Sequence, residues 1–169
     1  RQPVMEKPVT SHYQYLETSL GRLRLVSDGN HLTAIEFPNR QNSHPTGIEQ
    51  SDPVLDLAAA QLREYFTGVR RQFDLPLAAG GTAFQQRVWR ALGNIPYGEL
   101  RSYSDIARAL ENDKAVRAVG AANGRNPIPI VVPCHRVIGS DGSLTGFAGG
   151  LEVKRALLTL EGATIPRQT

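Results

Sequence analysis

A single cysteine stands beside two basic residues in the stretch IVVPCHRVIGS, residues 130–140. Cys134 follows a proline and precedes His135 and Arg136. A lone cysteine is more often an inert core residue than a nucleophile, but burial of a thiol requires neither a base nor a charge beside it. Nearby positive charge lowers the pKa of a thiol, and an imidazole can accept its proton. The tetrapeptide PCHR therefore predicts an activated, nucleophilic thiol.

The β-branched run at residues 130–132 predicts that Cys134 lies at the end of a buried strand. Because adjacent side chains of an extended segment point to opposite sides, we expect a bridging water, not direct contact, between His135 and the sulfur. The imidazole then needs a partner at its other nitrogen. Glu161, at the end of the last predicted helix, is a candidate partner or else a solvated glutamate. Asn126 is a second candidate or a plain turn residue.

Two short helices separated by a tight break predict a helix-turn-helix at residues 102–124. The second helix, KAVRAVGAANG, is mostly Ala, Val and Gly, and Arg117 is its one long side chain besides Lys114. Such a helix cannot read many base edges in a major groove, whereas its small side chains suit the close approach of a minor groove. Arg117 would then fill the gap left by an extruded base. The alternative is a core-packed helix with a solvated arginine.

The elements that position these residues follow from periodicity and turn signals. Residues 13–37 alternate apolar and polar side chains around two turns, which predicts a three-stranded antiparallel meander. Residues 52–68 predict a capped helix that packs on this sheet. Further capped or apolar-faced helices are predicted at residues 82–94 and 151–162.

This layout predicts an α+β fold, within the broad α/β class, built of two lobes. Residues 1–81 form an N-terminal lobe with a small antiparallel sheet and a helix, and residues 1–12 of it are expected to be a flexible tail. Residues 82–169 form a mostly helical C-terminal lobe that carries the helix-turn-helix and the PCHR loop. Residues 1–4 precede the only methionine and are expected to be a remnant of processing or of a longer chain.

The composition is that of an ordinary globular protein, with 169 residues, 40% hydrophobic and 21% charged. One cysteine excludes an internal disulfide and a zinc site built of several thiolates, so no structural metal is expected. No apolar run reaches the roughly 18 residues of a membrane span, and no signal peptide is visible, which favours a cytoplasmic protein without a membrane partner. The net charge of +3 permits a polyanionic partner without requiring one.

Three segments together, GNIPYGELRSYSDIA, KAVRAVGAANGRNPIPIVVPCHRVIGSDGSLTGFAGGLEVKRALL and LEG, resemble the O6-alkylguanine-DNA alkyltransferase family in order and spacing. The resemblance covers residues 82–162, and the N-terminal lobe is similar only in layout. It implies DNA repair by one irreversible transfer of the alkyl group from O6-alkylguanine in double-stranded DNA, with no cofactor and no metal. It also implies base flipping by a protein that is a monomer in solution and can assemble cooperatively on DNA.

The same resemblance implies a role for each residue of the site. Cys134 accepts the methyl group, His135 is the water-mediated base and Glu161 orients it. Asn126 braces the active-site turn, and Tyr103 contacts the flipped guanine and its phosphate. Further residues are implied to contact DNA or the flipped base: Arg117, which fills the vacated stack, Ala118, Gly120, Ala121, Pro129, Val131, Ser140, Phe147, Ala148 and Gly149.

Positions 147 and 148 depart from the family members that carry hydroxyl side chains facing the base. Phe147 and Ala148 make this wall of the pocket small and apolar up to Gly150. We therefore expect alkyl groups bulkier than methyl to be accepted, and we extend this expectation to O4-methylthymine.

Three other functions fit parts of the pattern. A noncatalytic damage sensor of the same fold lacks the acceptor cysteine, which this chain has. A cysteine hydrolase needs Cys and His to meet from distant parts of the chain, whereas here they are adjacent. A helix-turn-helix regulator needs base-reading side chains and commonly a dimer interface, and the second helix is too poor in long side chains for base reading.

Overall fold

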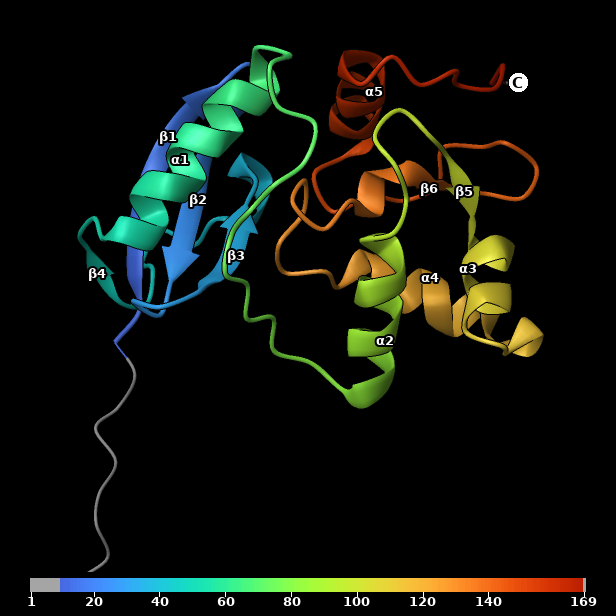
Figure 1. Cartoon of the computed structure of the whole chain (residues 1–169), viewed down its shortest axis with the longest axis horizontal. Helices are drawn as coiled ribbons and strands as arrows, with labels where there is room; N and C mark the ends of the chain where they lie inside the picture. The colour runs from blue at the N-terminus through green and yellow to red at the C-terminus, as the bar shows by residue number, and fades with distance from the viewer. Residues whose placement is uncertain (1–9, 169) are drawn as a thin grey trace, which may run out of the picture.

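The computed structural model describes residues 10–168, which form two lobes side by side (Figure 1). In the N-terminal lobe, β1 (His12–Thr18), β2 (Gly21–Ser27) and β3 (Leu32–Glu36) form the antiparallel meander, as predicted. The short strand β4 (Ile48–Glu49) adds a parallel edge beside β1, so the order of the sheet is β3-β2-β1-β4. The predicted α+β fold class is therefore confirmed in this lobe.

The predicted flexible tail at residues 1–12 is wrong at its C-terminal end. His12 opens β1, and the carbonyl of Ser11 accepts a hydrogen bond from Ile48 N at 2.9 Å. The start of β1 is held by pairing with β4. The short strand β4 lies in a loop, and the alternation of apolar and polar residues does not reveal it there. Residues 1–9, and with them the prediction on residues 1–4, lie outside the described part of the chain.

Helix α1 (Pro53–Phe66) covers one face of this sheet (Figure 1). Asp52 caps it, since its side chain accepts a hydrogen bond from Leu55 N at 2.8 Å. Pro53 occupies the first turn, where a missing N–H costs no helical hydrogen bond. The face towards the sheet includes Tyr65, a fully buried side chain near the end of the helix.

The C-terminal lobe is mostly helical, as predicted. Its elements among the described residues are α2 (Ala83–Leu92), β5 (Arg101–Ser102), α3 (Tyr103–Ala109), η2 (Asp113–Ala115), α4 (Val116–Gly124), η3 (Cys134–Arg136), β6 (Val137–Ile138) and α5 (Leu151–Leu160). The strands β5 and β6 pair in parallel, so the segment after Arg136 is joined to the start of α3. One further 3-10 helix, η1 (Pro38–Arg40), follows β3 in the N-terminal lobe.

The helix-turn-helix consists of α3, η2 and α4. Ser102 and Asp105 form a capping box at the start of α3, in which each side chain accepts a hydrogen bond from the other residue's backbone N–H, at 3.0 and 2.8 Å. Helix α4 begins at Val116, two residues later than predicted, because the residues before it form a 3-10 turn. Its buried face, Val119 and Ala122, packs into the core of the lobe.

The predicted strand before Cys134 is wrong, because the chain folds back on itself there. Val132 N donates to Ile128 O at 2.9 Å, and Ile130 has φ +74°. Prolines at positions 127, 129 and 133 remove the donors that a strand would need. The apolar run is buried as a turn, and a short apolar run alone does not separate these outcomes.

This turn lies between two apolar cores. Ile128 and Ile130 belong to the core of the N-terminal lobe, where they join Leu23 and Leu25 of β2. Cys134 belongs to the core of the C-terminal lobe. The segment that carries the thiol is therefore held from both lobes, which fixes its geometry.

No helix within residues 10–168 has the length and apolarity required to cross a membrane.

Candidate active site

Cys134 is buried, with 4% of its surface exposed, in the first position of η3. Burial raises the pKa of its thiol to about 11, and a hydrogen bond with the side chain of Asn126 and the charge of Lys154 only partly oppose this. The thiol is therefore protonated at neutral pH. The predicted lowering of the thiol pKa by adjacent basic residues is wrong for the protein without DNA, because burial outweighs charge.

The ring of His135 is fully buried and meets Glu161 at its Nε2 atom, 2.7 Å from Oε2. Burial lowers the pKa of His135, although the hydrogen bond to Glu161 opposes the shift. The neutral ring then carries its proton on Nε2, where the carboxylate accepts it. Its Nδ1 is buried and has no hydrogen-bond partner among residues 10–168. The imidazole thus offers a proton acceptor on the side away from Glu161.

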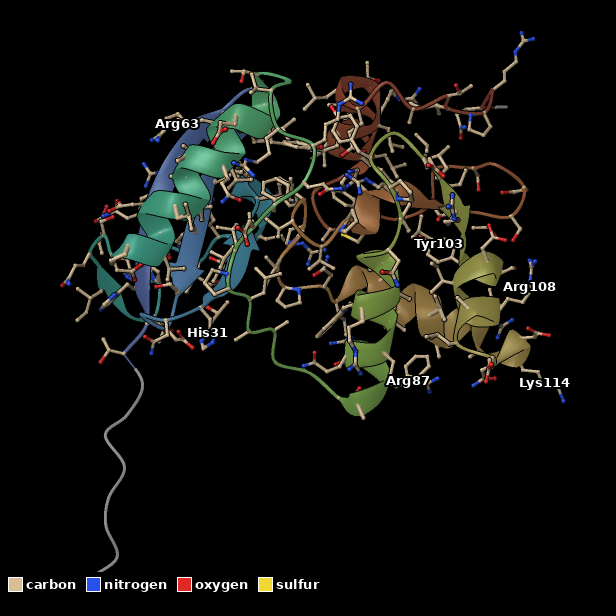
Figure 2. All side chains as sticks on the ribbon, in the orientation of Figure 1. His31, Arg63, Arg87, Tyr103, Arg108 and Lys114 are labelled. Carbon is tan, nitrogen blue, oxygen red and sulfur yellow. The ribbon has the colours of Figure 1, made fainter. Side chains whose placement is uncertain are left out.

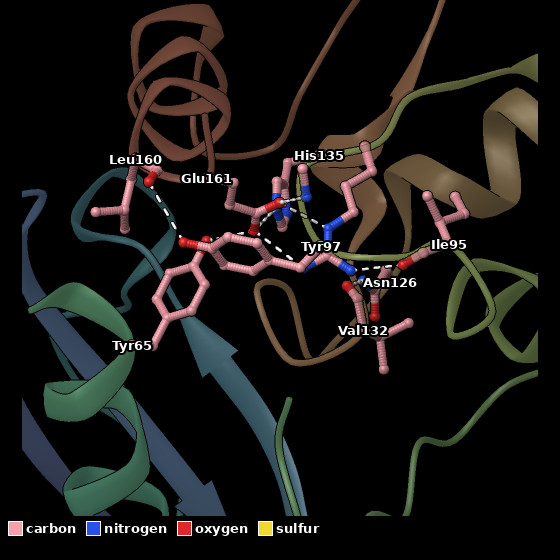
Figure 3. Close-up of polar contacts among 10 residues, drawn as sticks. Tyr65, Ile95, Tyr97, Asn126, Val132, His135, Leu160 and Glu161 are labelled. Carbon is pink, nitrogen blue, oxygen red and sulfur yellow. Dashed lines mark hydrogen bonds and ion pairs between the residues drawn. The ribbon is translucent and has the colours of Figure 1, made fainter. Parts of the chain in front are cut away.

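Glu161 is the centre of a buried network, shown in Figure 3. Arg136 donates from Nε to Oε1 at 2.8 Å and from Nη2 to Oε2 at 3.0 Å, and its Nη1 donates to Ile95 O at 2.6 Å. Burial raises the pKa of Glu161, but hydrogen bonds from His135 and Arg136 prevail and hold it far below the ordinary value. Arg136 therefore directs its charge at the carboxylate and not at the sulfur, which corrects the role that its place beside Cys134 suggested.

Asn126 closes the turn that precedes the cysteine. Its Nδ2 donates to Val132 O at 2.8 Å, and its Oδ1 accepts from Ile128 N at 3.0 Å. Within this turn Pro129 is buried and Val131 is half-buried. The side-chain amide thus forms hydrogen bonds with both sides of the turn. A residue in an ordinary surface turn would not need these two bonds.

Tyr103 lies at the start of α3, with Thr145 against its hydroxyl. Thr145 Oγ1 donates to the Tyr103 hydroxyl oxygen at 2.9 Å, which leaves the phenolic proton free to donate. Burial raises the pKa of Tyr103, so the hydroxyl keeps this proton. Gly120 of α4 faces the same ring, since a Cβ atom there would lie 3.9 Å from Cδ1. Ser140, at the far end of the PCHR loop, shares a hydrogen bond of 3.0 Å with Ser104.

The loop with Phe147, Ala148 and Gly149 is attached to the N-terminal lobe. The carbonyl of Ala148 accepts from the side chains of Asn39 and Arg40 at 3.0 and 3.1 Å. The ring of Phe147 packs on Phe37 at 5.5 Å between centroids, and a Cβ atom on Gly149 would lie 2.8 Å from the same Phe37 ring. The role of this loop as an apolar wall of the substrate pocket, and its tolerance of larger alkyl groups, stay predictions.

The exposed face of α4 is small and basic. Arg117, Ala118 and Ala121 are exposed on it, and Gly120 is half-buried. Figure 2 shows two further basic side chains of the helix-turn-helix, Arg108 and Lys114, which extend away from the lobe. This face can approach a polyanion closely over a short helix.

Three buried polar residues around the thiol and the Glu161 network were not among the residues predicted from the sequence. Lys154 is fully buried, and its Nζ donates to Val137 O at 2.6 Å and to Thr145 O at 3.1 Å. Burial lowers its pKa to about 8. Its place three residues before Leu157, on the buried face of α5, is a signal that could have found it. Asn123, whose Nδ2 lies 3.4 Å from Cys134 O, and Tyr65, which donates to Glu161, also lie on the buried faces of their helices, but this position does not reveal their polar partners.

No group of three or more His, Cys, Asp or Glu side chains within the described residues is arranged to hold a metal ion.

Two family models match the chain. Residues 11–79 match the ribonuclease-like domain of 6-O-methylguanine DNA methyltransferase, and residues 83–163 match its DNA binding domain. Among curated proteins, the methylated-DNA–protein-cysteine methyltransferase of Haemophilus influenzae is 47% identical over 153 residues, 89% of this chain and 86% of its own length. The constitutive enzyme of that name from Bacillus subtilis is 46% identical over 89% of this chain and 95% of its own. Among solved structures, Mycobacterium tuberculosis OGT in complex with DNA has a TM-score of 0.83 at 47% identity, covering 89% of this chain and 92% of its own.

Proposed function

The chain belongs to the 6-O-methylguanine DNA methyltransferase family, and we propose from this premise how its own residues carry out the reaction. The protein repairs DNA by transferring a methyl group from methylated DNA to a cysteine of its own chain. Cys134 is the only cysteine in the sequence and therefore the acceptor. This proposal rests on the position of that thiol. Cys134 directly precedes His135, whose buried ring pairs with Glu161.

The reaction begins with a proton transfer. One water molecule passes the thiol proton of Cys134 to Nδ1 of His135, while Glu161 holds the Nε2 proton and stabilises the imidazolium that forms. This assignment is supported by the buried, unpaired Nδ1 among the described residues and by the 2.7 Å contact on the opposite side of the ring. At neutral pH this relay supplies the thiolate, since burial otherwise keeps the thiol protonated.

The thiolate then attacks the alkyl carbon in line with the bond to O6. The sulfur–carbon bond forms as the carbon–O6 bond breaks, and the electron pair stays on guanine, which regains a proton at N1 or O6. We assign the Tyr103 hydroxyl, which is oriented by Thr145 and keeps its proton, as the hydrogen-bond donor that stabilises the leaving guanine anion. The proton that guanine then takes up from solvent balances the proton that Cys134 gave to His135. The amide of Gly150 is not a donor in this arrangement, because it already donates to Phe147 O at 2.9 Å. The product is a thioether that water does not cleave, so each molecule reacts once.

DNA is the partner, and we propose that α4 enters the minor groove of a duplex that carries O6-alkylguanine. Its exposed small residues, Ala118 and Ala121, allow the backbone close approach, and Arg117 fills the stack when the base flips out. Pro129, Val131 and the loop from Phe147 to Gly149 would line the pocket for the flipped base. Binding of this kind is salt-dependent and nearly blind to sequence.

We propose further that the protein acts as a monomer in the cytoplasm and can assemble cooperatively along DNA. The large exposed apolar side chains of residues 10–168 come from separate segments of the chain and do not follow one another on any single helix or strand: Ile48, Leu57, Val69, Leu77 and Leu151. A single unpaired cysteine suits a reducing compartment. We also propose Gly81 as the boundary between the two lobes.

The single-turnover reaction is tested by its stoichiometry. With methylated duplex in excess over protein, the lesion lost should equal the protein present, in one phase that then stops. The measurement is the amount of O6-methylguanine left after hydrolysis of the DNA, at two protein concentrations. Continued loss of lesion beyond one equivalent would show turnover and contradict the proposal.

Replacing Arg117 with alanine should slow transfer about tenfold, equal to about 1.4 kcal/mol of lost transition-state stabilisation, since the extruded base is no longer replaced in the stack. Binding to undamaged duplex should weaken much less. Lys114→Ala, which removes one exposed charge from the neighbouring η2, is the matched control and should change both measurements equally. Transfer by Arg117→Ala at the wild-type rate would show that Arg117 has no part in flipping.

A further inference from the structure

One side chain of the N-terminal lobe contacts the proposed proton relay. The hydroxyl of Tyr65 donates to Glu161 Oε2 at 2.6 Å, across 96 positions of sequence. Tyr65 comes from the end of α1 and is fully buried, and Figure 3 shows its hydroxyl directed at the carboxylate. No step assigned above uses this contact.

Tyr65 and His135 share the same carboxylate oxygen. Oε2 of Glu161 accepts from Tyr65 at 2.6 Å, from His135 Nε2 at 2.7 Å and from Arg136 Nη2 at 3.0 Å. The other oxygen accepts from Arg136 Nε at 2.8 Å and from Gly98 N at 3.3 Å. A carboxylate oxygen that already accepts strong hydrogen bonds offers less charge to a further donor. The Tyr65 hydroxyl therefore weakens the hydrogen bond between Glu161 and His135.

The Tyr65 hydroxyl stays a donor throughout the working pH range. Burial, together with the charge of Glu161, raises the pKa of Tyr65 far above its ordinary value, so the phenol does not ionise. Its effect on the shared oxygen is a fixed property of the folded protein and does not titrate. It is present only when α1 is docked against the C-terminal lobe.

We propose that Tyr65 is a positioning residue that sets the basicity of His135 by sharing Glu161 with it, an inference that rests on the proposed relay. A docked N-terminal lobe thereby keeps the imidazole neutral and able to accept the thiol proton. Without the Tyr65 hydroxyl, the carboxylate would favour the imidazolium more strongly, and a larger fraction of the protein would hold a protonated His135 that cannot accept.

The other groups around the network define a control. Tyr97 lies against Tyr65 at 6.3 Å between ring centroids, but its hydroxyl donates to Leu160 O at 3.3 Å and does not touch the carboxylate. Lys154 donates to backbone carbonyls. The titratable or charged groups near the carboxylate and the imidazole are thus Cys134, Arg136, Lys154, Tyr65 and Tyr97, and the two tyrosines differ in their contact with Oε2.

Tyr65→Phe removes the hydroxyl alone, and Tyr97→Phe is the matched control. We expect the rate of single-turnover methyl transfer in Tyr65→Phe to reach half of its plateau at a pH higher by roughly half a unit, since a neutral donor shifts a neighbour's pKa less than a full charge does. The plateau rate should be at least that of the wild type, because the acceptor is more basic. Tyr97→Phe should keep the wild-type profile. A uniform loss at all pH values in Tyr65→Phe would indicate a structural role only and overturn the inference.

A second measurement does not depend on transfer. In the protein without DNA, the nuclear magnetic resonance signal of the His135 Nε2 proton should move downfield in Tyr65→Phe, since its hydrogen bond to Oε2 strengthens. The signal should not move in Tyr97→Phe. An unmoved signal in folded Tyr65→Phe would refute the inference even if the wild type transfers methyl groups normally. Failure of the wild type to transfer, with the signal shifted, would instead refute the proposed function.

Discussion

Cys134→Ala should lose all alkyl transfer and keep its affinity for DNA. The sequence contains no second cysteine, so no other thiol can take the group. The thiol lies in the apolar core of the C-terminal lobe, away from the exposed face of α4, so DNA binding has no reason to change. Loss of one buried sulfur should destabilise the fold by about 1 kcal/mol, which leaves it folded.

Transfer of an isotope-labelled methyl group and anisotropy of a labelled duplex test these two expectations on the same preparation. Retained transfer would place the acceptor on another atom. Loss of both transfer and binding would mean that the thiol supports the DNA-binding surface, contrary to its separate position.

His135→Ala should slow transfer by about 10²- to 10⁴-fold at pH 7, the range over which a positioned base contributes. Without the imidazole, the Cys134 thiol, with its pKa of about 11, must lose its proton directly to solvent. The thiolate fraction then rises about tenfold with each pH unit below that pKa, whereas the relay of the wild type needs no such rise. The deficit of the variant should therefore shrink as the pH increases from 7 to 9.

The measurement is the single-turnover rate at saturating duplex across that range. His31→Ala, which changes an exposed histidine of the N-terminal lobe, is the control and should follow the wild type. A deficit of the same factor at pH 7 and pH 9 would argue against proton acceptance by His135.

Local signals in the sequence were enough for most of the fold. The meander, α1 with its Asp52 cap and the capping box of α3 all depend on neighbours within a few residues, so periodicity and capping chemistry predict them. The segment before Cys134 shows where such signals fail. Its apolar run suits a strand as well as a buried turn, and the choice is made by the Asn126 side chain and by two cores from different lobes.

The site was predictable in its residues and less so in its energetics. Glu161 was predicted as the partner of His135 because a carboxylate at the C-terminal end of a helix needs a compensating group. In the structure its Oε2 lies 2.7 Å from His135 Nε2. The pKa of the Cys134 thiol could not be inferred from the residues next to it in sequence. Arg136 pairs with Glu161 instead of the thiol, and burial has the largest effect on the thiol pKa. The contact of Tyr65 with Glu161 could not be predicted, because it joins residues 96 positions apart in two lobes.

In the proposed reaction, one buried thiol takes the alkyl group permanently. The most direct test is to mix the protein with duplex DNA that carries an isotope-labelled methyl group on guanine O6, and to determine the mass of the protein and of its peptides. We expect one labelled methyl group per chain, confined to the peptide that contains Cys134. Unlabelled protein beside repaired DNA, or label on any other peptide, would contradict it.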